Sequence, residues 1–241
     1  MDDTLQHIPD LGTNDGYFNF ELIDIAARLT NASMFVIDYT RNKMAYRTKS
    51  LLFIDEVREN NTLRKDPNPY WSLVTKSDFD AIYEGRKAYL NLMEGFNLQQ
   101  RLQNTCVIDC HINLRNRPHM VTLKFTPLRL RDEGRRLWLG LFCISTSSYK
   151  SDKRLTVLGS EFCYKYDFEK KSFFPAKRIE LSTLEKDILV RASEGMASEQ
   201  IADDLCRSVN TIKTHKSRLY EKLHVNSMSE ALAITKNYNL L

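Results

Sequence analysis

Apolar residues recur at helical spacing through the last part of the chain. A short helix is predicted over 198–205, with its apolar positions at Ile201, Ala202 and Leu205. A longer helix is predicted over about 209–223 behind Ser208, a favoured N-cap residue, and its inner side carries Val209, Ile212, Leu219 and Leu223. Its outer side is a polar stripe of Asn210, Lys213, Thr214 and Ser217. The pattern predicts a basic amphipathic helix held against a shorter helix across the turn 206–208.

Upstream, strand-like and helix-like patterns alternate in blocks. An amphipathic helix is predicted over 18–29, after a loose arm over 1–16. Apolar or alternating runs then predict five strands, two before a helical middle and three after it, over 34–39, 44–48, 105–114, 119–130 and 136–146. The helical middle is predicted to contain three helices, over 51–59, 77–83 and 85–102.

Polar segments and helix caps suggest where the domains meet. Residues 147–153 form a polar connector, and 161–168 with 172–175 predict a small β-hairpin between the domains. Capping boxes at Ser182–Glu185 and Ser227–Glu230 start the first and last helices of the C-terminal part. The predicted organisation is an arm and helix over 1–32, a sheet domain over 33–148, a connector over 149–178 and a helical domain over 179–241.

An ordered set of residues in this C-terminal part points to a known family. Thr211, Ile212, Lys213, His215, Lys222, Leu223 and Val225 follow one another at a characteristic spacing, with Leu181, Ser182, Glu185, Gly195, Ile201 and Ala202 upstream and Glu230, Ala231 and 239–241 downstream. The set resembles the signature of LuxR/FixJ-type helix-turn-helix domains. The resemblance implies that helix 209–223 is a recognition helix that enters the DNA major groove.

Four positions depart from the family pattern. Ala197 stands where a capping Ser is usual, Glu199 where a Lys often contacts phosphate, and Met228 where Arg is frequent. His224 replaces the usual glycine, so it carries strain if that position requires a positive φ.

The order of the upstream elements resembles a PAS domain, a five-stranded antiparallel sheet whose helical middle covers one face. The expected fold class is therefore α+β: a PAS-like domain followed by an all-α, four-helix helix-turn-helix domain. A small-molecule pocket between the sheet and the helices of 77–102 would be lined by Phe35, Ile37, Leu92, Phe96 and Phe142. The alternative for these residues is a fully packed core.

The resemblance places Lys213, Thr214 and Ser217 at base-facing positions. Lysine can donate to guanine, threonine can touch a thymine methyl, and Asn210 can reach adenine or a phosphate. Thr211, Arg218 and Lys222 lie beside the stripe, where phosphate contacts are expected. Lys216 falls toward the apolar side, so its stem should pack while its ammonium extends toward the DNA backbone. His215 is expected to be structural. The family also implies a homodimer, with Ala231, Leu232 and Thr235 of the final helix at a dimer surface.

Composition and charge restrict the class of protein. The 241 residues carry a net charge of +4 and 27% charged residues, which fits a globular protein and permits nucleic-acid binding. The N-terminus lacks a signal-peptide pattern and the longest apolar run, 137–144, is too short to span a bilayer, so a cytoplasmic protein is expected. The five cysteines lie in apolar contexts typical of reduced, buried thiols.

Chemical motifs favour a regulator over an enzyme. The chain has no GxSxG, Walker, GxGxxG or HExxH motif. Cys106 and Cys110 would share one face of a strand while His111 points to the other, so no metal site is predicted, and no cofactor is expected. The sequence predicts a transcription regulator that binds double-stranded DNA and is modulated by a ligand or partner at the PAS-like domain. The alternative is a protein-interaction adaptor with weak DNA binding.

Overall fold

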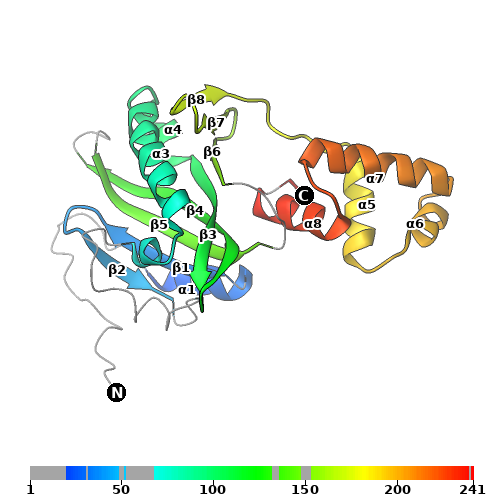
Figure 1. Ribbon diagram of the computed structural model, residues 1–241, viewed down its shortest axis with the longest axis horizontal. Helices are drawn as coiled ribbons and strands as arrows, with labels where there is room; N and C mark the ends of the chain where they lie inside the picture. Colours follow the sequence, from blue (N-terminus) through cyan, green and yellow to red (C-terminus); the bar gives the residue numbers. More distant parts are fainter. Residues whose placement is uncertain are drawn as a thin grey trace, which may run out of the picture. The chain divides into compact units, whose positions relative to one another are not determined.

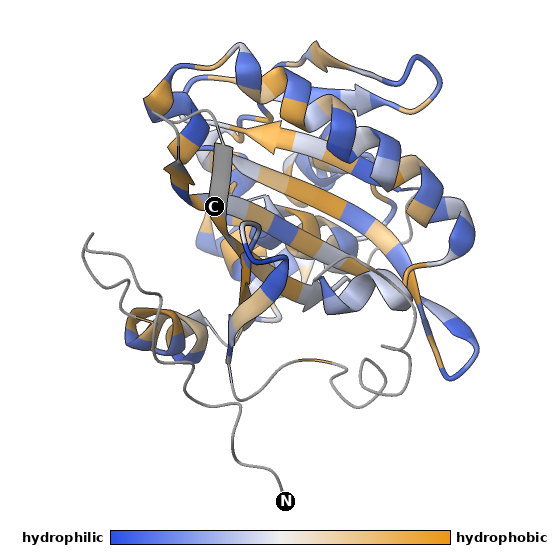
Figure 2. Cartoon of the chain, turned by 90° about the vertical axis from the view of Figure 1, so that its left-hand side faces the viewer, coloured by the Kyte–Doolittle hydropathy of each residue, from blue (hydrophilic) through white to orange (hydrophobic). Residues whose placement is uncertain are grey.

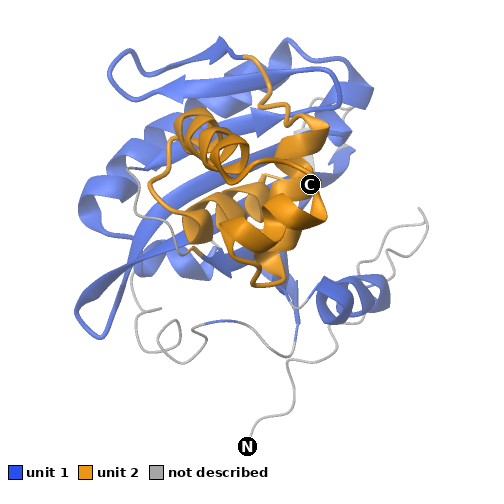
Figure 3. Cartoon of the chain, turned by 90° about the vertical axis from the view of Figure 1, so that its right-hand side faces the viewer, with its two compact units in different colours: residues 1–146, 153–176 blue, residues 147–152, 177–241 orange. Residues whose placement is uncertain are grey.

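The computed structural model describes residues 20–30, 32–48, 52, 68–131, 136–147, 153–238 and 240–241, without the side chains of 131 and 136–138. The chain divides into two compact units (Figure 3): unit 1 is Met1–Thr146 with Lys153–Ala176, and unit 2 is Ser147–Asp152 with Lys177–Leu241. The arm expected over 1–16 and all but one residue of the helix expected over 51–59 lie outside the described residues.

Unit 1 is built on one sheet of eight strands in the order β2-β1-β5-β4-β3-β6-β7-β8 (Figure 1). Every neighbouring pair is antiparallel. The strands are β1 Ser33–Asp38, β2 Lys43–Arg47, β3 Thr105–Leu114, β4 Arg117–Arg131, β5 Arg136–Thr146, β6 Arg154–Leu158, β7 Cys163–Asp167 and β8 Ser172–Pro175. The first five agree to within two residues at each end with the strands expected from the sequence.

The last three strands correct the expected strand count. We predicted five strands and a separate hairpin in the connector, whereas β7 and β8 continue the sheet through β6, which the pattern did not reveal. β6 pairs with β3, for example Cys106 with Val157. Most of β3 is buried on both faces, so an unpaired edge here would leave backbone donors and acceptors without partners. β6 supplies those partners.

Helices cover part of this sheet. They are α1 Glu21–Thr30, the short 3-10 helix η1 Pro69–Ser72, α3 Lys76–Glu94 and α4 Leu98–Leu102. A shared apolar core joins η1 and α3 to the sheet and includes the fully buried Tyr70, Phe35 and Ile82.

The two helices expected over 77–83 and 85–102 are divided elsewhere: α3 is continuous through position 84 and ends at Glu94, and α4 forms the end of the second expected helix. Gly85 lies inside α3, where a Cβ atom would come within 2.5 Å of the Leu155 side chain. The glycine thus allows close packing of the helix against β6 instead of ending it. The break comes later, where Asn97 caps α4 and accepts a hydrogen bond of 2.9 Å from the Gln100 amide.

Unit 2 contains the four helices expected from the sequence: α5 Thr183–Ser193, α6 Ser198–Asp204, α7 Val209–Leu223 and α8 Met228–Asn237. α6 and α7 lie within one residue of their expected bounds, and α5 and α8 begin at the expected caps. Ser182 and Glu185 form the predicted capping box of α5, and Gly195 follows that helix with φ +87°. The apolar cluster at the centre of α5, α6 and α7 contains Ile188, Ile201, Ala202 and Ile212.

Candidate nucleic-acid interface

A tight turn fixes the direction in which α7 leaves α6. Cys206 has a left-handed φ of 50°, and its amide donates to the Asp203 carbonyl at 3.1 Å. The Arg207 amide donates to the Ala202 carbonyl at 2.9 Å, which satisfies another C-terminal carbonyl of α6. Ser208 then caps α7 by accepting from the Thr211 amide at 3.0 Å. The backbone of the turn is therefore held by hydrogen bonds on both sides.

The buried side of α7 is the one that the sequence predicted. Ile212, Leu219 and Leu223 are buried, and Val209 is half-buried. The four members of the polar stripe, Asn210, Lys213, Thr214 and Ser217, are exposed. Arg218 on α7 and Arg207 in the turn are also exposed, so both guanidinium groups are accessible. The sequence did not single out Arg207 as a contact residue; its only signal was its position in the turn.

Two lysines of α7 contact protein groups instead of extending outward. Lys216 Nζ donates to Ser198 Oγ at 2.8 Å, and burial lowers the pKa of Lys216, opposed by the nearby Glu199 carboxylate. Lys222 Nζ lies 2.7 Å from Glu185 Oε2. These contacts tie α7 to the first turn of α6 and to the start of α5. Neither partner, Ser198 or Glu185, had been linked to these lysines from the sequence, because the pairs are far apart along the chain.

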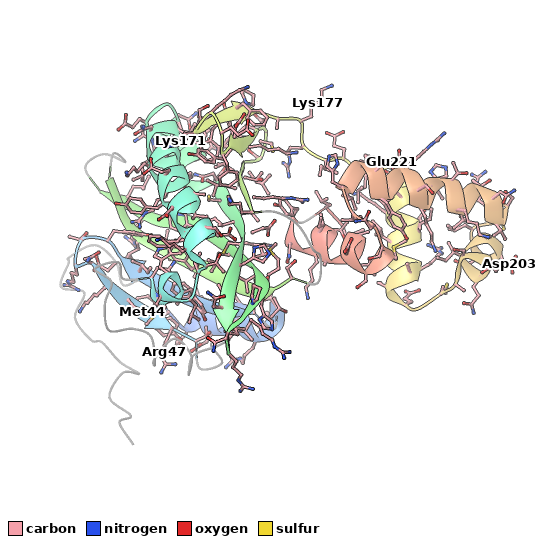
Figure 4. All side chains as sticks on the ribbon, viewed as in Figure 1. Met44, Arg47, Lys171, Lys177, Asp203 and Glu221 are labelled. Atoms are coloured by element: carbon pink, nitrogen blue, oxygen red, sulfur yellow. The ribbon has the colours of Figure 1, made fainter. Side chains whose placement is uncertain are left out.

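Thr211 and His215 are neither fully exposed like the polar stripe nor paired with a distant helix like Lys216 and Lys222. Thr211 is half-buried, and its hydroxyl lies 2.8 Å from Ser208 Oγ. His215 is also half-buried. Acidic groups lie on the same helices: Figure 4 labels the exposed Asp203 on α6 and Glu221 on α7, and Glu199 is exposed at the start of α6. The exposed surface of α6 and α7 thus combines the polar stripe with several carboxylates.

Glu185 connects two structural elements through one carboxylate. Its Oε2 accepts from the Ser182 amide at 2.8 Å as well as from Lys222. Burial alone would raise the pKa of Glu185, but the hydrogen bonds from Lys222 and Ser182 outweigh this and hold the pKa below its usual value. The carboxylate is therefore ionised in the folded protein at neutral pH.

Glu185→Gln is expected to lower the free energy of unfolding of unit 2 by about 1 kcal/mol near neutral pH, because the hydrogen bond from Lys222 loses its charged acceptor, whereas glutamine can still accept from the Ser182 amide. A folded pKa below the unfolded value of about 4.3 means that this stabilisation is present above that pH and disappears as the pH falls through the folded pKa. Urea unfolding of the full chain near neutral pH and again below the folded pKa of Glu185 measures this loss of stability. Glu221→Gln, at an exposed carboxylate, is the control; equal effects of the two variants would contradict the assigned role of Glu185.

His224 ends α7 in the left-handed conformation, with φ 55° and ψ 53°. Strain was expected at His224, which replaces the family's glycine, if its φ is positive, and the observed φ is positive. His224→Gly is expected to raise the free energy of unfolding by about 0.5–1 kcal/mol, because the left-handed conformation costs a residue with a Cβ more than it costs glycine. Thermal unfolding of the full chain would detect the gain. Asn226→Gly should give none, since Asn226 has no positive φ; a gain in both variants would argue against strain.

The residues expected at a dimer surface are mostly inaccessible. Ala231 and Thr235 are fully buried, and Leu232 is half-buried. Thr235 Oγ1 donates to the Leu232 carbonyl at 3.0 Å within α8. This burial leaves Leu232 as the accessible member of the expected set.

A cavity of about 420 Å³ lies within unit 1, between the sheet and α3. Its walls are mainly aromatic and aliphatic, with Arg86, Glu94 and Arg101 as charged members. Of the five residues expected to line a pocket, Phe142 does so; Phe35 and Ile37 are fully buried elsewhere in the core, and Leu92 and Phe96 are not in the wall. Phe35, Ile37 and Phe96 thus belong to the packed core and Leu92 packs against it, while Phe142 both belongs to the core and lines the cavity.

Two further properties concern the described part of the chain. It contains no cluster of three or more His, Cys, Asp or Glu side chains placed to hold a metal ion. None of its helices has the length and apolar character that crossing a bilayer requires.

Comparison with known proteins finds a family model that matches the C-terminal segment. Residues 180–235 match the family model described as "Bacterial regulatory proteins, luxR family". The uncharacterized transcriptional regulatory protein YhcZ of Bacillus subtilis is 35% identical over 75 residues, which cover 31% of this chain and 33% of that protein. The putative virulence-factor transcription regulator BvgA of Bordetella pertussis is 37% identical over 60 residues, covering 25% and 29%. The chain thus spans about a third of the length of these relatives.

Solved structures resemble the chain only weakly. The Vibrio cholerae VqmA dimer in the absence of target DNA aligns with a TM-score of 0.31 and 10% identity, over 92% of this chain and 89% of that one. Escherichia coli SdiA aligns with a TM-score of 0.29 and 18% identity, over 92% and 90%. Scores this low do not establish a shared fold. The sequence matches nevertheless agree with one another: residues 180–235 match the LuxR-family model, and both relatives named above are described as transcriptional regulators.

Proposed function

We propose that this protein is a transcription regulator that inserts α7 into the major groove of double-stranded DNA. The observation that carries the proposal is the arrangement of α7: its apolar side is buried, while Lys213 and Thr214 are exposed on the opposite side. A helix presented in this way against a shorter helix fits the groove and can reach base edges. Lys213, Thr214, Ser217 and Asn210 are proposed to face the bases.

The proposed phosphate contacts come from Arg218 and Arg207, which are exposed. Lys216 and Lys222 contribute less in this proposal than the sequence suggested, because each already donates to a protein oxygen. Thr211 is retained as a flanking contact. Two phosphate-contacting arginines per chain, and so four per dimer, predict a slope of about −4 in log K against log salt.

The experiment is a binding titration of the full chain against duplexes selected from a random pool, repeated at several salt concentrations. The proposal expects a selected duplex to bind more tightly than a scrambled one by three orders of magnitude or more, on the order seen for specific DNA-binding proteins. No detectable preference at low salt would contradict it. Such a result, together with tight binding to a partner protein, would favour the adaptor.

For unit 1 we propose a PAS-like sensor role. Strands β2, β1, β5, β4 and β3 are contiguous in the sheet, and η1 and α3 pack against it, which is the layout expected for that fold. The cavity supports binding of a small, largely apolar molecule with one or two polar groups near Arg86 or Glu94. Arg101 is held locally, since its guanidinium donates to the carbonyls of Phe96 and Glu94.

Native mass spectrometry of the purified full chain, together with a screen of small aromatic molecules by melting temperature, tests the sensor role. Binding is expected to raise the melting temperature of unit 1 in proportion to the logarithm of ligand concentration. A protein that carries no ligand and responds to none of the molecules would count against the sensor while leaving the DNA-binding proposal intact.

A further inference from the structure

The hydroxyl group of Tyr89, a residue of the cavity wall, donates to a buried side chain. Tyr89 lies on α3, and its hydroxyl is 2.8 Å from Oδ1 of Asn104, which immediately precedes β3. Asn104 is fully buried. Its Nδ2 donates to the carbonyls of Gln100 and Arg101 at 3.1 and 2.7 Å, and carbonyls can only accept, so the orientation of the amide is fixed. Oδ1 therefore faces Tyr89 as an acceptor, and the phenol proton is committed to it.

Asn104 is held by contacts with three elements, which keeps the Tyr89 hydroxyl in place. The carbonyls to which its Nδ2 donates belong to α4. Nδ2 also lies 3.2 Å from Sδ of Met93 on α3, and the backbone carbonyl of Asn104 accepts from Thr126 Oγ1 on β4 at 2.8 Å. Asn104 is thus a positioning residue for the Tyr89 hydroxyl.

The Tyr89 and Cys106 side chains are uncharged at neutral pH. Burial and the nearby Cys106 raise the pKa of Tyr89 well above its ordinary value, although the hydrogen bond to Asn104 opposes them. Burial also raises the pKa of the Cys106 thiol, another wall residue, to about 12. A charged ligand group against these neutral side chains would lose its hydration without gaining an opposite charge, which is costly. The ligand group that meets this part of the wall is therefore uncharged.

Aromatic rings line the cavity around Tyr89. Tyr89 and Phe125 meet edge to face, with ring centroids 5.9 Å apart, and Phe125 is tilted against Phe142 with centroids 4.9 Å apart. The central strands of the sheet are largely hydrophobic (Figure 2). A planar aromatic molecule can continue this tilted packing. At about 30 Å³ for one water molecule, the cavity of about 420 Å³ has room for roughly fourteen non-hydrogen atoms, enough for a substituted pair of fused rings.

We infer that the cavity selects an uncharged aromatic ligand that donates a hydrogen bond, and that Tyr89 accepts this bond because Asn104 takes its own proton. A phenol oxygen both donates and accepts, so it can still accept once its proton is committed. A ligand group that can only accept would meet the Tyr89 oxygen without a proton between them, and it would bind less tightly. This selection requires the sensor role proposed for unit 1, and it adds the chemical class of the ligand and the residue that determines it.

Two probes of nearly the same shape test the selection. β-Naphthol has a hydroxyl donor and its methyl ether has none, and each is titrated into the full chain by calorimetry. The wild-type protein is expected to bind β-naphthol about tenfold more tightly than the ether, as one hydrogen bond to a buried group provides. Tyr89→Phe should weaken β-naphthol binding about tenfold and leave the ether within about twofold. Tyr39→Phe, which removes the hydroxyl of another wall tyrosine, is the matched control and should keep the preference.

A second variant tests the role of Asn104. Asn104→Ala frees the phenol proton, so Tyr89 can then donate to the ether oxygen, and the preference for β-naphthol should fall below about threefold. Melting temperatures report whether unit 1 of each variant is folded. The comparison of the two probes in the wild-type protein needs no variant, so it decides the selection even if Tyr89→Phe or Asn104→Ala does not fold.

Equal binding of the two probes by the wild-type protein would overturn the selection and leave the sensor role intact. A preference that survives in folded Tyr89→Phe, or one that Tyr39→Phe removes, would overturn the assignment to Tyr89. Binding of neither probe would also overturn the selection. The native mass spectrometry and ligand screen described above decide the sensor role separately.

Discussion

Lys213→Ala is expected to weaken binding of the full chain to a selected DNA duplex by about 1–3 kcal/mol, a loss of roughly fivefold to 150-fold. The side chain is exposed on the outer side of α7, next to Thr214, where it can donate to the edge of a guanine. Because the Lys213 side chain is exposed, the free energy of unfolding should stay within about 0.5 kcal/mol of the wild-type value. Fluorescence anisotropy with the selected duplex and urea unfolding measure the two quantities.

The specificity of this effect requires a control for charge alone. Lys186→Ala removes an equal charge from an exposed position on α5. It should lower the affinity for selected and scrambled duplexes by the same small factor, whereas Lys213→Ala should mainly reduce the difference between them. If both variants lose the same affinity on both duplexes, Lys213 acts only as a surface charge and the proposed recognition by α7 fails.

Ile212→Ala, one residue earlier on α7, should mainly lower the stability of unit 2. Ile212 is fully buried and packs in the cluster that contains Ile188 and Ile201. Its truncation removes apolar contacts and leaves a cavity, which is expected to destabilise unit 2 by about 2–5 kcal/mol. Specific DNA binding should be lost in proportion to the fraction of unit 2 that is unfolded, since the support of α7 against α5 and α6 is removed. Calorimetry and circular dichroism of the full chain report the unfolding.

A graded substitution separates this cavity effect from a specific role of the side chain. Ile212→Val removes one methylene group and should cost about 0.5–1.5 kcal/mol, with DNA affinity close to the wild type at temperatures where unit 2 stays folded. If Ile212→Ala left the stability of unit 2 unchanged, the assignment of this side of α7 to the core would be wrong. The neighbouring pair Ile212 and Lys213 thus tests both sides of the helix.

The sequence by itself determined most of unit 2. Ser182, Ser208 and Ser227 cap their helices as expected, and the apolar positions of α6 and α7 are buried or half-buried. The exposure of Lys213 and Thr214 follows from the same periodicity. These features depend on residues within a few positions of one another, so the local pattern contains the information. The first five strands of unit 1 were predictable for the same reason.

The tertiary structure decided what depends on residues far apart in the chain. Gly85 lies inside α3 and does not end a helix. A glycine stands there because the side chain of Leu155 occupies the space that a Cβ atom would need, and Leu155 lies on a strand that the sequence pattern did not reveal. Lys222 pairs with Glu185, 37 positions away, and Lys216 with Ser198, 18 positions away, so the ammonium groups are held by protein oxygens. The cavity wall combines α3 with several strands. Sequence spacing cannot reveal such partners, because packing and hydrogen bonding between distant segments select them only once the chain has folded.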